Sequence, residues 1–317
     1  MQVYLGIDVG SVTTKVAALD ENDELVASSY ARTEGKPIVV VQQALREIAE
    51  TLPAGTEVAG IGTTGSGRYL AGAMVGADVM KNEITAHAVA ASHYFPETRT
   101  ILEIGGQDSK IILLRDGVAV DFAMNTVCAA GTGSFLDQQA YRLHMSIEDF
   151  GPAALQSKSP VRIAGRCTVF AESDMIHKQQ MGHSVPDILY GLCEALARNY
   201  LNNLGLGKEI LPPVVFQGGV AANKGMIRAF EETLKTEIQV PRHHHIMGAI
   251  GAALLAHEDM IAESRSSSFR GFGVSDLNYR TSSFECKGCS NLCEILEIRA
   301  GRELVARWGG RCGKWDA

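Results

Sequence analysis

The chain repeats one pattern twice, and this repeat limits the folds available to it more than any other feature. Residues 3–29 and 100–122 each run through an apolar strand, a turn rich in glycine, aspartate and serine, a second apolar strand, and a polar turn into a third. Lys15 aligns with Lys110 at an offset of 95 residues. Apolar strands joined by glycine turns predict antiparallel meanders, so we expect two related α/β halves.

Helical patterns follow each predicted meander and complete the expected halves. They cover Val40–Leu52 in the first half, and Gly133–His144 and Asp187–Leu204 in the second. We expect the halves to span residues 1–95 and 96–262, a linker rich in serine, arginine and glycine to span 263–284, and a cysteine-rich metal-binding module to span 285–317. A small-molecule site is expected in a cleft between the halves, where such sites commonly form.

Composition excludes several classes of protein. With 46% hydrophobic and 21% charged residues and 33 glycines in 317, the chain is typical of a glycine-rich globular protein. Its net charge of −7 argues against nucleic acid as a partner. The longest apolar run near the end of the main body, Ile246–Ala256, is shorter than the roughly 20 residues that cross a bilayer. No basic leader precedes the first strand, so we expect a cytoplasmic protein with no membrane partner.

Three glycine turns that follow strands indicate a nucleotide site. Gly6–Lys15 and Glu103–Ser109 each combine a carboxylate with backbone N–H groups that can cradle a phosphate, and Val214–Asn223 is a further strand that ends in a glycine pair. One such turn alone is typical of an ordinary hairpin. Together they predict that two turns grip the β- and γ-phosphates while Asp8 and Asp108 hold Mg²⁺ through its waters.

These motifs resemble those of the actin, sugar-kinase and Hsp70 ATPase superfamily, with Gly6–Lys15 as phosphate-1, Gly105–Asp108 as phosphate-2 and Gln217–Asn223 as the adenosine motif. Two cysteine-bearing segments, Asn125–Phe135 and Gly165–Ser173, resemble those of the activators of 2-hydroxyacyl-CoA dehydratases. This group is related to the ATPase subunits of benzoyl-CoA reductases and to the reductases of double-cubane-cluster proteins. The resemblance covers about residues 1–260 and implies two ribonuclease-H-like α/β halves around a central nucleotide cleft.

The resemblance also implies an activity and a set of site residues. It implies a homodimer that couples hydrolysis of MgATP to ADP with low-potential electron transfer, from one [4Fe–4S] cluster at the dimer interface to a partner iron–sulfur dehydratase or reductase. A ferredoxin or flavodoxin would be the upstream donor. The implied catalytic residues are Asp8, Gln107 and Asp108, and the implied nucleotide-binding residues are Gly10, Ser11, Val12, Thr13, Thr14, Lys15, Gly105, Gly106, Gly131, Thr132, Gly133, Gly218, Gly219 and Asn223.

Reasoning from the residues agrees that Cys128 and Cys167 bind a shared cluster. A cubane takes four thiolates, and these two cysteines lie too far apart in sequence for one ligand loop, so two-fold symmetry would supply the other pair. Each precedes a helical pattern, Gly133–His144 or Val169–Met181, whose N-terminus favours an anionic cluster. These helices begin near the phosphate turns, which suggests a mechanical link from γ-phosphate to cluster. The alternative interpretation is two buried cysteines that serve as small apolar residues.

The C-terminal cysteines form a separate set. Cys286, Cys289, Cys293 and Cys312 flank a predicted hairpin that folds the last cysteine back onto the first three. Four thiolates suit tetrahedral Zn²⁺ or a second iron–sulfur cluster, and the spacing favours zinc because it matches no ferredoxin run. A metal-free thiol cluster is the alternative.

The other conspicuous residues have plainer interpretations. Cys193 lies on an apolar helical stripe and is expected in the core, and His243–His245 is expected in a polar loop because consecutive residues do not share a helix face. Gly62–Arg68 is expected to be a plain turn or an interdomain contact. The basic C-terminal residues are expected to form a solvated surface.

Three functions remain open at this point. The first is the ATP-driven reductase. The second is a small-molecule kinase for a sugar or an acid, with Asp108 or a neighbour as the base. The third is a regulator without enzymatic activity that carries a structural zinc. Cys128 and Cys167 favour the first, because the other two functions need no interface thiolates.

Overall fold

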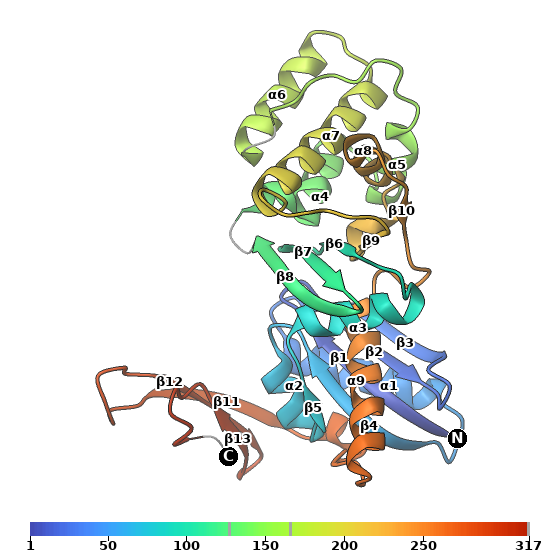
Figure 1. Cartoon of the computed structure of the whole chain (residues 1–317). Helices are drawn as coiled ribbons and strands as arrows, with labels where there is room; N and C mark the ends of the chain where they lie inside the picture. The colour runs from blue at the N-terminus through green and yellow to red at the C-terminus, as the bar shows by residue number, and fades with distance from the viewer. Residues whose placement is uncertain (126–127, 165–166, 316–317) are drawn as a thin grey trace. The chain divides into compact units, whose positions relative to one another are not determined.

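The computed structural model describes residues 1–125, 128–164 and 167–315, and two compact units make up the fold (Figure 1). Met1–Ala86 and Gly248–Ala317 form the first unit, and His87–Met247 forms the second. The segment after residue 247 therefore belongs with the N-terminal half rather than with residues 96–262. Four residues of the cysteine motifs, Thr126, Val127, Gly165 and Arg166, lie outside the described residues.

The sheet of the first unit has the strand order β3-β2-β1-β4-β5. Its strands are β1 (Gln2–Val9), β2 (Thr13–Leu19), β3 (Leu25–Arg32), β4 (Glu57–Thr64) and β5 (Val79–Met80). The first three form the predicted antiparallel meander, β4 is parallel to β1, and β5 is parallel to β4. Because β1 and β4 run parallel, their carboxyl ends meet at one edge of the sheet.

Helices α1 (Pro37–Thr51) and α2 (Arg68–Val75) contact this sheet, and apolar residues at helical spacing explain why α1 forms. Helix α9 (Met247–Glu263) packs so closely on β1 and β4 that a side chain at Gly6 or Gly62 would run into its backbone. The chain passes from the first unit to the second within α3 (Glu83–Tyr94) and returns to the first unit at the start of α9. Among the described residues no helix is long and apolar enough to span a membrane.

The second unit repeats the strand order in its own sheet, β10-β9-β6-β7-β8. Its strands are β6 (Thr100–Ile104), β7 (Ser109–Arg115), β8 (Val118–Asn125), β9 (Val214–Gln217) and β10 (Ile238–Gln239). The helices are η1 (Ala129–Gly131), α4 (Gly133–Arg142), α5 (Ile147–Ala154), α6 (Thr168–Gln180), α7 (Val185–Leu204), η2 (Gly219–Ala222) and α8 (Lys224–Leu234). Helix α7 runs through the largest apolar core, with α5, α6 and α8 against it (Figure 1). Each unit thus contains one of the two predicted meanders, with helices packed on its sheet.

The C-terminal region packs on the first unit. It contains η3 (Phe272–Asp276) and an antiparallel sheet of β11 (Tyr279–Glu285), β12 (Glu294–Ala300) and β13 (Glu303–Trp308). Val274 and Ile298 are buried in the core of the first unit. Residues 263–284, expected as a linker, are held in part by Asp78, whose carboxylate accepts hydrogen bonds from the Ser267 hydroxyl at 2.6 Å and the Ser268 amide at 2.6 Å. Removing the C-terminal region would therefore uncover apolar core.

Candidate nucleotide and cluster sites

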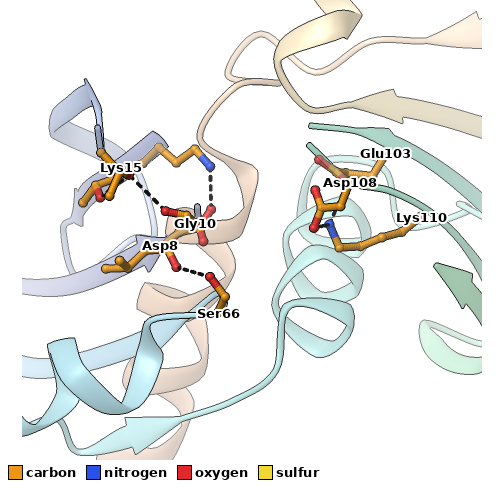
Figure 2. Close-up of polar contacts among 10 residues, drawn as sticks. Asp8, Gly10, Lys15, Ser66, Glu103, Asp108 and Lys110 are labelled. Carbon is orange, nitrogen blue, oxygen red and sulfur yellow. Dashed lines mark hydrogen bonds and ion pairs between the residues drawn. The ribbon is translucent and has the colours of Figure 1, made fainter. Parts of the chain in front are cut away.

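The phosphate-1 turn is a tight loop between β1 and β2. The Gly10 amide donates to the Thr13 carbonyl at 2.9 Å, which closes the turn. Asp8, on β1, pairs in register with Lys15 on β2, and the Lys15 ammonium lies 2.9 Å from the Asp8 carboxylate (Figure 2). Asp8 is buried, and Lys15 keeps 17% of its side chain exposed. The turn therefore holds a fixed carboxylate and an accessible cation at one strand end.

The other predicted nucleotide-binding residues of this turn differ in how far they are exposed. Ser11 is exposed, and Val12 and Thr13 are half-buried. Thr14 is fully buried, and its hydroxyl lies 3.0 Å from that of Thr33, so it holds the turn together from within.

Two glycines that sequence reasoning did not assign enclose Asp8. A Cβ atom on Gly65, which has a φ of +85°, would stand 2.6 Å from Asp8 Oδ1, and one on Gly248 would stand 2.8 Å from Asp8 Oδ2. The Ser66 hydroxyl donates to the Val9 carbonyl at 3.4 Å (Figure 2). The segment 62–68, read from sequence as a plain turn or an interdomain contact, thus lies against the catalytic candidate. The available signal was its position at the end of a strand parallel to β1.

The phosphate-2 turn contains a second carboxylate–lysine pair. Lys110 is almost fully buried, and its ammonium lies 2.9 Å from Glu103 and 3.0 Å from Asp108 (Figure 2). Register pairs Glu103 with Lys110 as it pairs Asp8 with Lys15, so Glu103 rather than Asp108 is the counterpart of Asp8. The Gly105 amide donates to the Asp108 carbonyl at 3.0 Å. Gly106 is half-buried and Gln107 is exposed.

The adenosine motif is fixed by a histidine that sequence analysis placed in a polar loop. Gly218 has a φ of +92°, a conformation that favours glycine, and a Cβ atom there would stand 2.7 Å from Glu103 Oε1. The Gly218 amide donates to the His244 carbonyl at 2.8 Å, and His244 Nδ1 lies 2.9 Å from the Gly218 carbonyl. Asn223 caps α8 by accepting from the Gly225 amide at 2.9 Å. Gly219 begins η2 directly after this turn.

Several buried polar atoms near these strand ends lack a hydrogen bond within the described part of the chain. They are Thr64 Oγ1, Ser109 Oγ, Gln217 Oε1 and Asn223 Nδ2. Buried polar groups are nearly always paired, so each is a candidate for contact with a ligand or an ordered water. Gly131 lies beside one of them, since a Cβ atom there would stand 3.6 Å from Ser109 Oγ.

The start of α4 is hydrogen-bonded to the phosphate-2 turn. The Gly133 amide donates to the Gly105 carbonyl at 2.8 Å, and the Ser134 amide donates to the Gly106 carbonyl at 2.9 Å. Thr132 is fully buried and forms the N-cap of α4. A shift of the turn would therefore move the start of α4.

The two central cysteines lie at helix starts. Cys128 forms the N-cap of η1, and Asn125 holds it through two bonds: the Cys128 amide donates to Oδ1 at 3.0 Å, and Nδ2 donates to the Cys128 carbonyl at 2.7 Å. Cys167 forms the N-cap of α6. Both thiols are free and half-buried. Arg142 of α4 pairs with Glu172 of α6 at 2.7 Å, which ties the two helices together.

Comparison with known proteins decides the family. The model of the BadF/BadG/BcrA/BcrD ATPase family matches residues 5–256. The chain belongs to this family. It is 36% identical over 263 residues to the (R)-2-hydroxyglutaryl-CoA dehydratase activating ATPase of Acidaminococcus fermentans, which covers 81% of this chain and 98% of that protein.

Solved structures agree with this assignment. The ADPNP-bound activator of the 2-hydroxyisocaproyl-CoA dehydratase from Clostridium difficile superposes with a TM-score of 0.73 at 32% identity, over 83% of this chain and 97% of that one. A ROK family glucokinase from Streptomyces griseus shares the fold, with a TM-score of 0.52 at 12% identity, over 81% of this chain and 99% of that one. The predicted family and the α/β fold are confirmed.

The remaining cysteines of this ATPase fall into two groups. Cys193 is fully buried in α7, as predicted, and burial raises the pKa of its thiol well above the ordinary value. The C-terminal cysteines Cys286, Cys289, Cys293 and Cys312 are free thiols. Within residues 1–125, 128–164 and 167–315, no three His, Cys, Asp or Glu side chains already surround a common point suited to a metal ion. The metal site of the C-terminal cysteines therefore stays a prediction.

Proposed function

We propose that this ATPase is a low-potential electron donor that couples MgATP hydrolysis to electron transfer from a [4Fe–4S] cluster shared by two copies of the chain. The acceptor would be a partner iron–sulfur enzyme, such as a 2-hydroxyacyl-CoA dehydratase or a double-cubane-cluster protein, and a ferredoxin or flavodoxin would resupply the electron. The observation that carries the proposal is the hydrogen-bonded connection from the phosphate-2 turn to α4, whose N-terminus follows Cys128 by a few residues.

The residues at the strand ends fit a magnesium nucleotide. The glycine turns at Gly10 and Gly105 would bind phosphate through backbone N–H groups, and Asp8 and Asp108 would hold Mg²⁺. The unpaired polar atoms of Gln217 and Asn223 support a ligand at the adenosine motif. Lys15, more exposed than Lys110, is the lysine that can reach a phosphate. The ADPNP bound to the Clostridium difficile activator agrees with a nucleotide here.

Cys128 and Cys167 fit an iron–sulfur cluster completed by a second copy. Two thiolates per chain are half of a cubane's ligand set. Val169 and Phe170, in the first turn of α6 directly after Cys167, expose 65% and 67% of their surface. Large apolar side chains at such exposure favour a protein partner over water. When bound, the cluster supplies a one-electron carrier.

Coupling between nucleotide and thiolates would run through the chain's own contacts. Loss of the γ-phosphate would relax the phosphate-2 turn, and the amides of Gly133 and Ser134 would transmit that change to α4. The Arg142–Glu172 ion pair would pass it to α6 and Cys167. The turn and the two helices would then have two arrangements, and a nucleotide shifts the balance between them only by its difference in affinity for the two.

Iron content of cysteine variants tests the proposal. The full chain, purified without oxygen, should carry about four iron atoms per dimer, with a paramagnetic signal after dithionite reduction that MgATP alters. Cys128→Ala and Cys167→Ala should each abolish this signal and leave ATP binding intact. Cys193→Ser is the matched control, because Cys193 is a buried core residue and its replacement should leave the iron in place.

Two results would contradict the proposal. One is a colourless, iron-free protein from anaerobic purification. The other is a full four-iron cluster on a strict monomer in sedimentation analysis, since the chain offers two central cysteines.

A further inference from the structure

The C-terminal cysteines lie beyond the part of the chain that the family model matches, which ends at residue 256. The proposed electron transfer makes no use of them. Their positions in the fold follow from the ladder of the C-terminal sheet, the loop between β11 and β12, and the segment after β13.

Cys286 and Cys293 form a cross-strand pair. The β11–β12 register ends with Glu285 opposite Glu294, and the Cys286 amide donates to the Cys293 carbonyl at 2.8 Å, which extends the ladder by one step. Directly opposed residues project their side chains from the same face of a sheet, with Cβ atoms about 4.5–5.5 Å apart. Two thiols therefore leave the sheet side by side at its end.

Cys289 lies in the short loop between these two. The Leu292 amide donates to the Cys289 carbonyl at 3.3 Å, which turns the loop back toward Cys293. Gly288 lies next to the first thiol, since a Cβ atom there would stand 3.4 Å from Cys286 Sγ. The loop thus passes close to the Cys286 sulfur, and Cys289 is exposed.

The segment after β13 returns to the same end of the sheet. Gly309, with a φ of +105°, lies so close to the Glu294 carbonyl that a Cβ atom would stand 2.5 Å from its oxygen. The Trp315 indole N–H donates to Cys286 Sγ at 3.1 Å, and its ring packs edge-on against Phe284 at 5.1 Å. Cys312 precedes Trp315 by three residues, so its Cα atom lies within about 11 Å of the Trp315 Cα atom.

We propose that Cys286, Cys289, Cys293 and Cys312 bind one Zn²⁺ ion per chain, and that the ion fastens residues 309–315 to the β11–β12 loop. The chemistry fits in three ways. Four thiolates form the ligand set of a structural zinc site. The indole N–H on Cys286 Sγ is the type of outer contact that orients a metal ligand. Lys287, Arg311 and Lys314 lie beside the cysteines in sequence and offset the charge of the thiolates.

Geometry favours zinc over a second cluster. Zn–S bonds of about 2.3 Å in a tetrahedron place the sulfurs about 3.8 Å apart, a separation that a cross-strand pair reaches by side-chain rotation. A cubane holds its cysteine sulfurs farther apart, because four iron atoms lie between them. The exposed Cys289 and Cys312 would move toward the Cys286–Cys293 pair when the ion binds. A bound metal ion adds most stability to a small element such as this three-stranded sheet, which is followed by a segment without regular structure.

Metal analysis of the full chain tests the site. The protein, purified anaerobically, should contain about one zinc per chain, and the double variant Cys289→Ser/Cys312→Ser should contain none while keeping its central iron. Both changes lie at exposed positions, so the fold should survive. Cys193→Ser is again the control and should keep its zinc. Replacement of zinc by Co²⁺ should give the intense absorption of tetrahedral cobalt–thiolate bonds in the wild type and not in the double variant.

Trypsin supplies a second readout that needs no variant. Arg311 and Lys314 lie in the segment that the ion would fasten, so a zinc chelator should speed cleavage after them at least tenfold, and added zinc should reverse the effect. The proposal is overturned if the wild type lacks zinc, if the double variant holds as much zinc as the wild type, or if the double variant loses iron in place of zinc. The central cluster is measured by the iron that depends on Cys128 and Cys167, and the C-terminal site is measured by zinc. A wrong prediction for one site can therefore be told apart from a wrong prediction for the other.

Discussion

Gly248→Ala should impair ATP hydrolysis far more than it changes the stability of the protein. The residue lies in the first turn of α9, where alanine is favoured over glycine by roughly 0.5–1 kcal/mol. The added methyl group would nevertheless stand 2.8 Å from Asp8 Oδ2 and 3.1 Å from Asp8 Cγ. The substitution therefore favours helix α9 but displaces the Asp8 carboxylate.

The structure sets the size of the effect. An ordinary contact between the methyl group and the carboxylate oxygen is about 3.4 Å, so Asp8 must move by about 0.6 Å. It has little room, because the Gly65 backbone lies against Oδ1 and the Lys15 ammonium holds Oδ2 at 2.9 Å. Since a misplacement of about 1 Å in a catalytic group can cost about 100-fold, we expect kcat to fall by about 10- to 100-fold.

Steady-state hydrolysis at varied Mg²⁺ concentration, alongside thermal unfolding, is the assay. Gly273→Ala is the matched control in the same unit, because a Cβ atom there would have no neighbour within 4 Å. The control should hydrolyse ATP normally and unfold at or near the wild-type temperature, and the unfolding temperature of Gly248→Ala should change little, because the strain at Asp8 opposes the gain in helix propensity. Wild-type kcat and Mg²⁺ dependence in Gly248→Ala would refute the role given to Asp8.

Two further predictions concern stability. Lys110→Met should lower the free energy of unfolding by about 3–5 kcal/mol, because it leaves the buried Glu103 carboxylate without its cation, and addition of Glu103→Gln should restore much of the loss in urea unfolding. Hydrogen bonds from the Ser184 hydroxyl, the Ser159 amide and other groups hold the pKa of Asp187 well below its ordinary value of 3.8. The stability from Asp187 is therefore present above that value and is lost as pH falls toward the lowered one, so Asp187→Asn should destabilise the protein at pH 7 and differ progressively less from wild type below pH 4.

The meanders, the main helices and the phosphate turns were predictable because each is encoded locally. Alternating apolar stretches and glycine turns predict β1–β3 and β6–β8, and α7 was placed within two residues of its start, because its apolar stripe and Pro186 lie in one window of sequence. The core position of Cys193 followed from the same stripe. None of these features depends on a distant partner.

The residues that complete the site could not be predicted in this way, because tertiary packing defines them. Gly248 is about 240 residues from Asp8, and its lack of a side chain matters because α9 begins against that carboxylate. His244 is one of three consecutive histidines, and nothing in its neighbours indicates that its ring lies against Gly218. Glu103 differs from these two residues, because the 95-residue offset that aligns Lys15 with Lys110 also aligns Asp8 with Glu103, and strand register agrees with it.

That equivalence separates the roles of the two lysines. Both halves place a carboxylate and a lysine opposite each other, next to a glycine turn, as expected of copies of one unit. In the second copy Asp108 occupies the position of Thr13, and Lys110 contacts two carboxylates while only 2% of its side chain is exposed. Such a lysine holds two carboxylates in place and exposes little of itself to a ligand. Lys15 contacts the Asp8 carboxylate and exposes 17% of its side chain, so replacing Lys15 should weaken nucleotide binding more than folding, whereas replacing Lys110 should do the reverse.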